Sequence, residues 1–298
     1  MSRDGPLMSW SHCPVCGAQE RSPHVEFDAL AFVRCAHCST VYKSRERQGV
    51  RAADFYEQEY HTGRSSKRHR RFEHRVRKAG NQIAAGLALT AAGRLLDIGC
   101  SLGYTLEAGR RLGLTAAGLD VSKFAVERCR QLGFEAEQGS LEQLPWDDEN
   151  FDIVVMKHVL EHTPQPKQAL REVARVLRPG GAVVITVPNL GYWKSLAFKR
   201  SYRYFRPDDL GRQHYVYYTK RTLAALLTAV GFSVAKTGKV IYRRRFPGRS
   251  GTGRMLEPVR FAGLLLWQSS ATVLLQRREV QMVASKPRRA GPAASSPD

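Results

Sequence analysis

The chain has 298 residues, a formal net charge of +20 at pH 7 and a sequence pI near 10.1. This length can bury a large core, so we expect one large domain with room for a small appendage. No apolar run approaches the roughly 20 residues of a membrane-spanning helix, and no signal sequence opens the chain, so we expect a cytoplasmic protein. The high positive charge predicts an acidic partner, either nucleic acid or an anionic membrane surface.

Four of the six cysteines lie in two short knuckles, Cys13 and Cys16 in CPVC and Cys35 and Cys38 in CAHC. The spacing is typical of a four-cysteine zinc site in which thiolates close a tetrahedral shell. We therefore predict a structural Zn²⁺ in a small zinc-ribbon domain over 1–48, with disulfides or a redox dithiol as alternatives. A segment this short buries little surface, so the metal would supply much of its folding free energy.

After a basic helical connector predicted at 49–90, short apolar strands alternate with helices. Strands are predicted at 94–100, 115–121, 134–139, 151–157, 182–189, 233–242 and 279–287, and helices at 106–113, 122–133, 166–181 and 219–232. Such alternation indicates an α/β fold in which helices cover both faces of a parallel sheet.

Between the last two predicted strands, residues 243–278 form a long insertion with an apolar stretch flanked by arginines. We expect a lid or dimer helix there, or a helix that lies on an anionic membrane interface. The tail at 288–298 is rich in Ala, Ser and Pro and is predicted to be disordered.

The first strand ends in Asp97, and the turn after it contains Gly99, Ser101 and Gly103. Glycine in such a turn lets the backbone approach a ligand closely. The three-glycine dinucleotide fingerprint is absent because Ser101 takes the middle position, so a pyrophosphate cradle is not indicated. The second strand ends in Asp120, where a carboxylate can accept both ribose hydroxyls of a nucleoside.

These segments resemble the class I S-adenosylmethionine-dependent methyltransferases over roughly 94–287. The resemblance rests on LLDIGCSLG, GLD, GSLEQLPWDDENFDIVV, HVLEHTPQP, EVARVLRPGGAVVITVPN and TLAALLTAVGF, which follow one another in the family's order and spacing. It implies a Rossmann-like sheet of seven strands, mostly parallel with an antiparallel last strand. The chain looks most like the branch that includes ubiquinone-biosynthesis O-methyltransferases.

The resemblance also implies which residues bind S-adenosylmethionine. Asp97 and the glycine turn would hold the methionine part, Asp120 the ribose, and GSLEQLP would border the adenine. The expected cofactor-binding residues are Asp97, Gly99, Ser101, Gly103, Asp120, Val121, Ser140, Leu141 and Lys157. Many relatives have an aspartate at the position of Ser140, so the backbone of Leu141 or the side chain of Glu142 is the candidate to contact the adenine amino group.

His158, Glu161 and His162 follow the fourth strand with the H-x-x-E-H spacing that some zinc peptidases use. A peptidase needs this motif on a helix of several turns. Here Thr163 and Pro164 follow at once, and proline cannot continue a regular helix comfortably. The peptidase interpretation is therefore rejected.

The resemblance places the same residues on the acceptor side of a methyl-transfer site. In the ubiquinone branch, two glutamates, a histidine and a later histidine can bind a divalent cation near the acceptor hydroxyl. This chain retains Glu161, His162 and His214, and has His158 in place of the first glutamate. We expect either a cation or a pair of residues that hold the substrate loop; without metal, His158 or His214 would be the general base.

The predicted function is O-methylation of a small or lipid-linked acceptor by a cytoplasmic enzyme, with peripheral contact to the inner face of the membrane as an extension. One alternative is an RNA methyltransferase that uses the zinc ribbon and the basic connector on ribosomal RNA. The [DNS]-P-P-[FYW] motif of many base methyltransferases is replaced by MKHVLEH, which argues against that chemistry. The other alternative is a non-enzymatic zinc-ribbon protein that senses S-adenosylmethionine.

Overall fold

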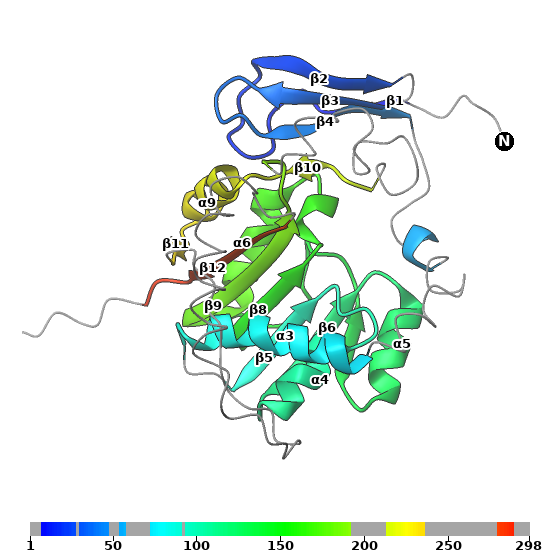
Figure 1. Ribbon diagram of the computed structural model, residues 1–298, viewed down its shortest axis with the longest axis vertical. Coiled ribbons are helices and arrows are strands. Elements are labelled where there is room, and N and C mark those ends of the chain that lie inside the picture. Colours follow the sequence, from blue (N-terminus) through cyan, green and yellow to red (C-terminus); the bar gives the residue numbers. More distant parts are fainter. Residues whose placement is uncertain are drawn as a thin grey trace, which may run out of the picture.

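The computed structural model describes residues 7–27, 30–47, 54–57, 72–90, 93–191, 213–235 and 279–288. Two sheets organise these residues, with the N-terminal sheet stacked at one end of a larger α/β body (Figure 1). The predicted insertion at 243–278 and residues 289–298 of the predicted tail lie outside the described residues. Within the described part, no helix is both long and apolar enough to cross a membrane.

The larger sheet confirms the predicted seven-stranded Rossmann-like architecture. Its order is β11 (Ser233–Val234), β12 (Glu279–Ser285), β9 (Leu177–Pro188), β8 (Phe151–Lys157), β5 (Arg94–Ile98), β6 (Thr115–Asp120) and β7 (Glu135–Gln138). The five strands from β9 to β7 are parallel, and β12 is antiparallel to β9. The carboxyl ends of β5, β6 and β8 therefore meet at one edge, where ligands bind in such sheets.

Helices cover both faces of this sheet, because neighbouring residues on each strand point to opposite sides. The helices are α3 (Phe72–Leu87), α4 (Tyr104–Arg111), α5 (Lys123–Gln131), α6 (Pro166–Val176) and α9 (Lys220–Ala229). Leu95 packs in the core formed with α3, α4 and α5, whereas Leu96 packs in the core formed with α6 and α9. Strands buried on both faces explain the continuous apolar runs of the sequence.

Most boundaries differ from the sequence-based expectation by a few residues, and the junction between α6 and β9 differs by five. The helix predicted at 166–181 ends at Val176, and β9 already begins at Leu177. Pro179 has no N–H for a helix and disfavours helical backbone in the residue before it. The two glycines that follow instead pair with Lys286, through Gly180 N to Lys286 O at 2.9 Å and Lys286 N to Gly181 O at 2.8 Å.

The N-terminal sheet is antiparallel and receives a strand from far along the chain. Its order is β1 (Leu7–Ser9), β4 (Val41–Arg47), β3 (Leu30–Cys35) and β2 (Arg21–Phe27). The short β10 (Val216–Tyr217) also pairs with β4, which pairs in addition with β1 and β3. This strand belongs to the segment that also carries His214, so the two sheets are joined at the predicted acceptor side.

Candidate active site

Two carboxylates lie at or near the ends of neighbouring strands at the predicted cofactor edge. Asp97 is the second-last residue of β5 and is nearly fully buried; burial raises the pKa of its carboxyl group well above the usual value, although a hydrogen bond from Thr105 opposes the shift. Asp120 ends β6, and its pKa is also raised by burial. Its Oδ2 accepts the Ser101 N–H at 2.9 Å and its Oδ1 accepts the Ser122 N–H at 3.0 Å. The Val121 N–H also bonds this carboxylate, which still has acceptor capacity for a ligand hydroxyl.

The turn between β5 and α4 takes left-handed backbone conformations at the three predicted positions. The φ angles are 77° at Gly99, 51° at Ser101 and 80° at Gly103. A Cβ atom added to Gly99 would lie 2.5 Å from Cγ2 of Val159, closer than real Cβ contacts allow. Glycine is therefore required at position 99 for both its conformation and the close approach of the chain that follows β8.

The other predicted cofactor residues border the same edge. The Val121 carbonyl accepts a hydrogen bond from Gln138 Nε2 at 3.1 Å, and Ser122 caps α5 as predicted by accepting the Ala125 N–H at 3.2 Å. Lys157 ends β8, and burial lowers the pKa of its ammonium group. The nearby Asp97 acts in the opposite direction on that pKa, so a cation and a buried carboxylate share the edge.

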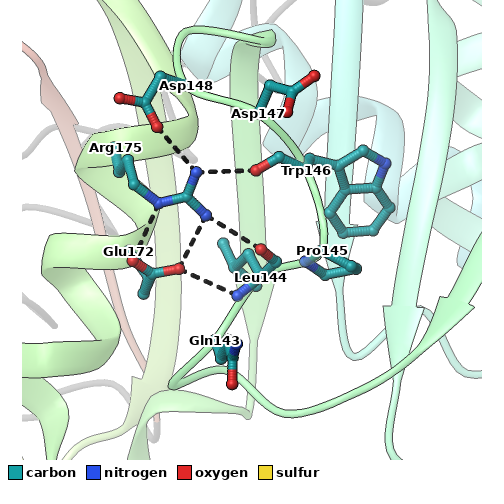
Figure 2. Close-up of a pocket in the computed structure, with 8 residues that line it drawn as sticks. All are labelled: Gln143, Leu144, Pro145, Trp146, Asp147, Asp148, Glu172 and Arg175. Carbon is teal, nitrogen blue, oxygen red and sulfur yellow. Dashed lines mark hydrogen bonds and ion pairs between the residues drawn. The ribbon is translucent and has the colours of Figure 1, made fainter.

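The loop predicted to border the adenine is tied down by its own chain. Leu141 is buried, Ser140 is exposed, and the Glu142 carboxylate accepts a hydrogen bond from Thr163 Oγ1. Arg175 donates to the carbonyls of Leu144 and Trp146 at 3.0 and 2.8 Å. A surface pocket of about 580 Å³ lies here (Figure 2); Gln143, Leu144 and Pro145 of this loop line it, but none of the nine residues expected to bind the cofactor does. Because Arg175 hydrogen-bonds several groups that line the pocket, we interpret these residues as a structural support for the loop and not as a ligand site.

His158 lies between two carboxylates. Its Nδ1 is 3.1 Å from Glu161 Oε1, and its Nε2 is 3.1 Å from Glu279 Oε1. Burial alone would lower the pKa of His158, but the two carboxylates outweigh it and raise the pKa to about 9. The His158 contact in turn lowers the pKa of Glu279 to about 2. At neutral pH, His158 is therefore an imidazolium that donates from both ring nitrogens.

We expect this contact to make stability depend on pH. The folded-state pKa of His158, about 9, exceeds its ordinary 6.5, so its contribution is complete below pH 6.5 and is lost as the pH rises through 9. The difference in unfolding free energy between wild type and His158→Gln should shrink over that window in urea titrations. His37→Gln is the control because the His37 side chain is 67% exposed. A difference that stays constant from pH 6 to 10 would contradict the assignment.

His162 has the opposite protonation state. Its Nδ1 lies 2.8 Å from the Gln213 carbonyl, which can only accept, so Nδ1 carries the proton. Burial lowers the pKa of His162, which favours the neutral ring. Its Nε2 therefore presents a lone pair, and the Tyr56 hydroxyl lies 3.1 Å from it.

Glu161, His162 and His214 form a compact group of candidate metal ligands. One ligand atom of each lies within 4.8 Å of the others, on the short 3₁₀ turn η1 (Leu160–His162) and on the segment before β10. Glu161 is 1% exposed, and its Oε2 has no hydrogen-bond partner among the described residues. A buried carboxylate oxygen without a partner is costly, so the donor set fits a divalent cation that accepts oxygen and imidazole ligands.

The comparisons with known proteins concern the stretch of chain that forms the larger sheet. Residues 96–185 match the family model described as "Methyltransferase domain". The chain therefore carries a methyltransferase domain, which agrees with its sequence resemblance to class I S-adenosylmethionine-dependent enzymes. In this domain, Asp97, the glycine turn and Asp120 lie along the first two strands, and Glu161 and His162 follow strand β8.

The similarity to curated relatives covers only part of each relative's length. The chain is 37% identical over 103 residues to a ubiquinone biosynthesis O-methyltransferase from Alkalilimnicola ehrlichii, which covers 32% of this chain and 42% of that protein. It is 32% identical over 114 residues to a 27-O-demethylrifamycin SV methyltransferase from Amycolatopsis mediterranei, covering 35% of this chain and 42% of that protein. The chain thus spans less than half the length of these curated relatives.

A solved structure shares the fold over a longer stretch. The similar chain belongs to a complex that contains the Trm112 methyltransferase activator of Haloferax volcanii, with a TM-score of 0.53 and 19% identity. The similarity covers 80% of this chain and all of that chain. At this identity the comparison supports the fold of the methyltransferase domain alone.

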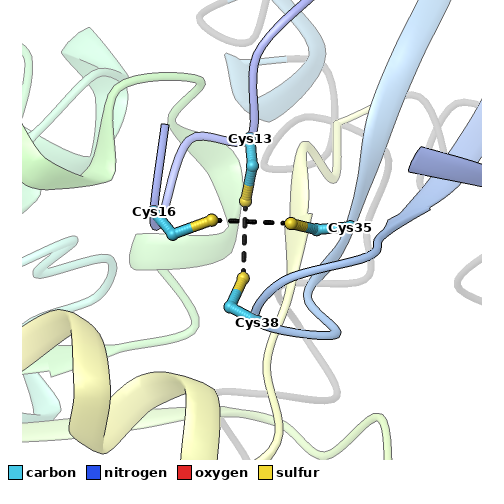
Figure 3. Close-up of side chains that lie close together, drawn as sticks. All are labelled: Cys13, Cys16, Cys35 and Cys38. Atoms are coloured by element: carbon cyan, nitrogen blue, oxygen red, sulfur yellow. Dashed lines mark hydrogen bonds between the residues drawn. The ribbon is translucent and has the colours of Figure 1, made fainter. Parts of the chain in front are cut away.

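Beside the methyltransferase domain, the four predicted zinc ligands come together. The sulfur atoms of the two knuckles point at one another (Figure 3), with Cys13 to Cys38 at 3.6 Å and Cys16 to Cys35 at 3.5 Å. All four sulfurs lie within 4.8 Å of one another. These separations are too long for disulfides, whose sulfurs are about 2.05 Å apart, and approach the roughly 3.8 Å edge of a tetrahedron with Zn–S bonds near 2.3 Å. The donor set therefore fits zinc.

Proposed function

We propose that the protein is an S-adenosylmethionine-dependent methyltransferase that methylates an oxygen of a small or lipid-linked acceptor. The observation that carries this proposal is the pairing of His162 after strand β8 of the methyltransferase domain: its Nδ1–H bonds the Gln213 carbonyl, so its Nε2, 3.1 Å from the Tyr56 hydroxyl, is a proton acceptor. An acceptor hydroxyl must lose its proton as it is methylated, and a neutral buried imidazole can accept it. One curated relative is named an O-methyltransferase, and the name of another gives an O-demethylated compound as its substrate.

The cofactor edge supplies binding and alignment. S-adenosylmethionine, when bound, provides an already activated methyl group, so the protein must chiefly hold an acceptor in line in a dry site. Asp97, buried near the end of β5, suits a cationic amino group, and the Asp120 carboxylate has acceptor capacity left for a ribose hydroxyl. The left-handed turn at Gly99 brings the backbone close enough to contact the methionine part.

The acceptor side divides its roles by protonation state. His158 is held protonated by two carboxylates at neutral pH, so we assign it to holding Glu161 in place rather than to the base role expected for it. We assign His162 as the base. If a divalent cation binds, Glu161, His162 and His214 would hold it, and it would act as a Lewis acid that makes the acceptor hydroxyl more acidic.

RNA is the second candidate acceptor because the chain carries a net charge of +20. A protein that neutralises phosphates with lysine and arginine binds nucleic acid with a steep salt dependence. The zinc knuckles and the basic connector predicted at 49–90 would contribute to such binding. A purely cofactor-sensing protein would bind S-adenosylmethionine and transfer no methyl group.

One experiment separates these candidates. The protein is incubated with methyl-labelled S-adenosylmethionine and cell extract, and RNA, lipid and small-molecule fractions are counted. We expect label in the lipid or small-molecule fraction, and a roughly 100-fold lower rate for His162→Asn, because general bases contribute about that much or more. Calorimetry should show an unchanged cofactor Kd for this variant. Label confined to RNA would support the second candidate, and no label from a cofactor-binding protein would support sensing.

A further inference from the structure

The segment at 213–218 connects the N-terminal sheet, which carries the four cysteines, to the acceptor side of the methyltransferase domain. On one flank, Lys43 N in β4 donates to the Tyr215 carbonyl at 2.8 Å, and β10 continues the pairing with Val216 opposite Tyr42. On the other flank, Tyr215 N donates to the Glu161 carbonyl at 2.8 Å. Two backbone hydrogen bonds thus link a strand of the N-terminal sheet, through Tyr215, to the backbone of Glu161, a candidate acceptor-site residue.

Side chains reinforce this link. The Trp10 and Tyr215 rings meet edge to face with centroids 5.4 Å apart, and Lys43 Nζ lies 4.0 Å from the Tyr215 ring centroid. Lys43 is 1% exposed and pairs with Glu46 at 2.8 Å. A buried ammonium group is tolerated because the carboxylate and the ring compensate for lost water. Any displacement of β4 would disturb these contacts together.

The cysteine knuckles are continuous with the same strand and the same core. Cys35 ends β3, its N–H donates to the Thr40 carbonyl at 2.9 Å, and β4 begins at Val41. Cys13 and Cys35 share one apolar cluster with Leu160 of η1 and Tyr218, which follows β10. We therefore expect the position of β4 to depend on how the four cysteines are arranged around a bound metal ion.

Both histidines of the acceptor group depend on this segment. His214 lies on it, and the Gln213 carbonyl holds His162 Nδ1–H at 2.8 Å, which directs the Nε2 lone pair. Among the described residues, β4 is the only strand that pairs with β10; the neighbouring Tyr218 makes one bridge to Asn189. Within the described part of the chain, the sheet pairing of this segment thus rests on β4 and on that bridge, beside which Leu190 N donates to the Tyr218 carbonyl at 2.8 Å.

We propose that the four-cysteine unit is a wall of the acceptor site, and that metal bound by its cysteines positions Glu161, His162 and His214. It is not a separate nucleic-acid-binding module attached to a finished enzyme. The proposal rests on the proposed function only in naming this the acceptor side. The structural coupling can be tested without any methyl transfer, so failure of the activity and failure of the coupling are distinguishable.

The test is hydrogen–deuterium exchange, read by mass spectrometry, on the full chain with and without zinc. Wild type loaded with zinc is compared with the same protein after chelation and with Cys16→Ser, and metal content is measured in each. We expect amides at 213–218 and 159–163 to exchange at least about tenfold faster without metal, because local opening is set by local contacts. Amides at 94–98 and 151–157 should keep their protection, and calorimetry should give the same Kd for S-adenosylmethionine.

His37→Ala is the matched control, because His37 lies inside the second knuckle yet is not among the grouped ligands. It should keep its zinc and the wild-type exchange pattern. Unchanged protection at 213–218 after metal loss would overturn the proposal, as would a wild type that binds no zinc. Faster exchange in the central strands as well would also overturn it, since the metal would then support overall stability rather than this site.

Discussion

The Asp120→Asn variant is expected to bind S-adenosylmethionine about 100-fold more weakly than wild type, a loss of about 2.7 kcal/mol. Asp120 accepts the N–H groups of Ser101 and Ser122 through separate oxygens. Asparagine keeps one acceptor and turns an N–H₂ group toward the other N–H, which leaves two donors facing each other. The charged acceptor for the ribose hydroxyls is lost as well, and charge-assisted hydrogen bonds contribute about 1.5–3 kcal/mol each.

Isothermal titration calorimetry measures this change, with Glu137→Gln as the control. Glu137 lies on the adjacent strand opposite Leu119 and forms an ion pair with Arg130 at the surface. Its substitution should leave the cofactor Kd within about threefold, because exposed ion pairs contribute little. If Asp120→Asn behaves like the control while remaining folded, Asp120 does not bind the ribose.

Gly99→Ala is expected to destabilise the domain by about 2–5 kcal/mol and to abolish measurable cofactor binding. Two costs add: the left-handed φ of 77° costs an alanine about 1–2 kcal/mol, and the new Cβ would lie 2.5 Å from Val159 Cγ2, an overpacking cost of about 1–3 kcal/mol. Relief of the clash requires movement of the turn or of Val159. Either movement displaces backbone at the predicted methionine side of the site.

Gly113→Ala separates the two costs, because Gly113 has a φ of 79° and no atom within 4 Å of an added Cβ. Urea unfolding should therefore show the backbone cost alone for Gly113→Ala, with cofactor binding retained. The double variant Gly99→Ala, Val159→Ala should recover part of the lost stability. Equal losses for Gly99→Ala and Gly113→Ala would show that the Val159 contact costs nothing.

Local patterns predicted most of the larger sheet, because a strand buried on both faces is an apolar run that ends in a recognisable turn. The predicted strand at 151–157 is β8, and the predicted Ser122 cap begins α5. The start of β9 at Leu177 was not predicted, since the pairing of its glycines with Lys286 joins residues more than a hundred positions apart. The predicted domain boundaries and the cytoplasmic location stay predictions.

Site residues were predictable where they lie next to one another, or at a characteristic spacing, in the sequence. Asp97, the Gly99 turn and the Glu161–His162 pair follow strands directly, and the cysteine spacing marked a metal-ligand set whose sulfurs do converge. Glu279, Tyr56 and Gln213 carry no such mark. Glu279 reaches His158 only because β12 lies antiparallel to β9, and it changes the protonation state that the sequence had suggested for His158.

The sequence therefore specified the fold class, the cofactor edge and the cysteine cluster, because each depends on short-range periodicity, capping or spacing. Which groups are charged and what supports the acceptor side depend on contacts between distant segments. The pairing of β10 with β4 joins residues about 175 positions apart, from Tyr42 to Val216, and Tyr215 beside it links Lys43 to Glu161. Such pairings leave no local pattern, since burial and hydrogen-bond partners arise only when both segments have folded together.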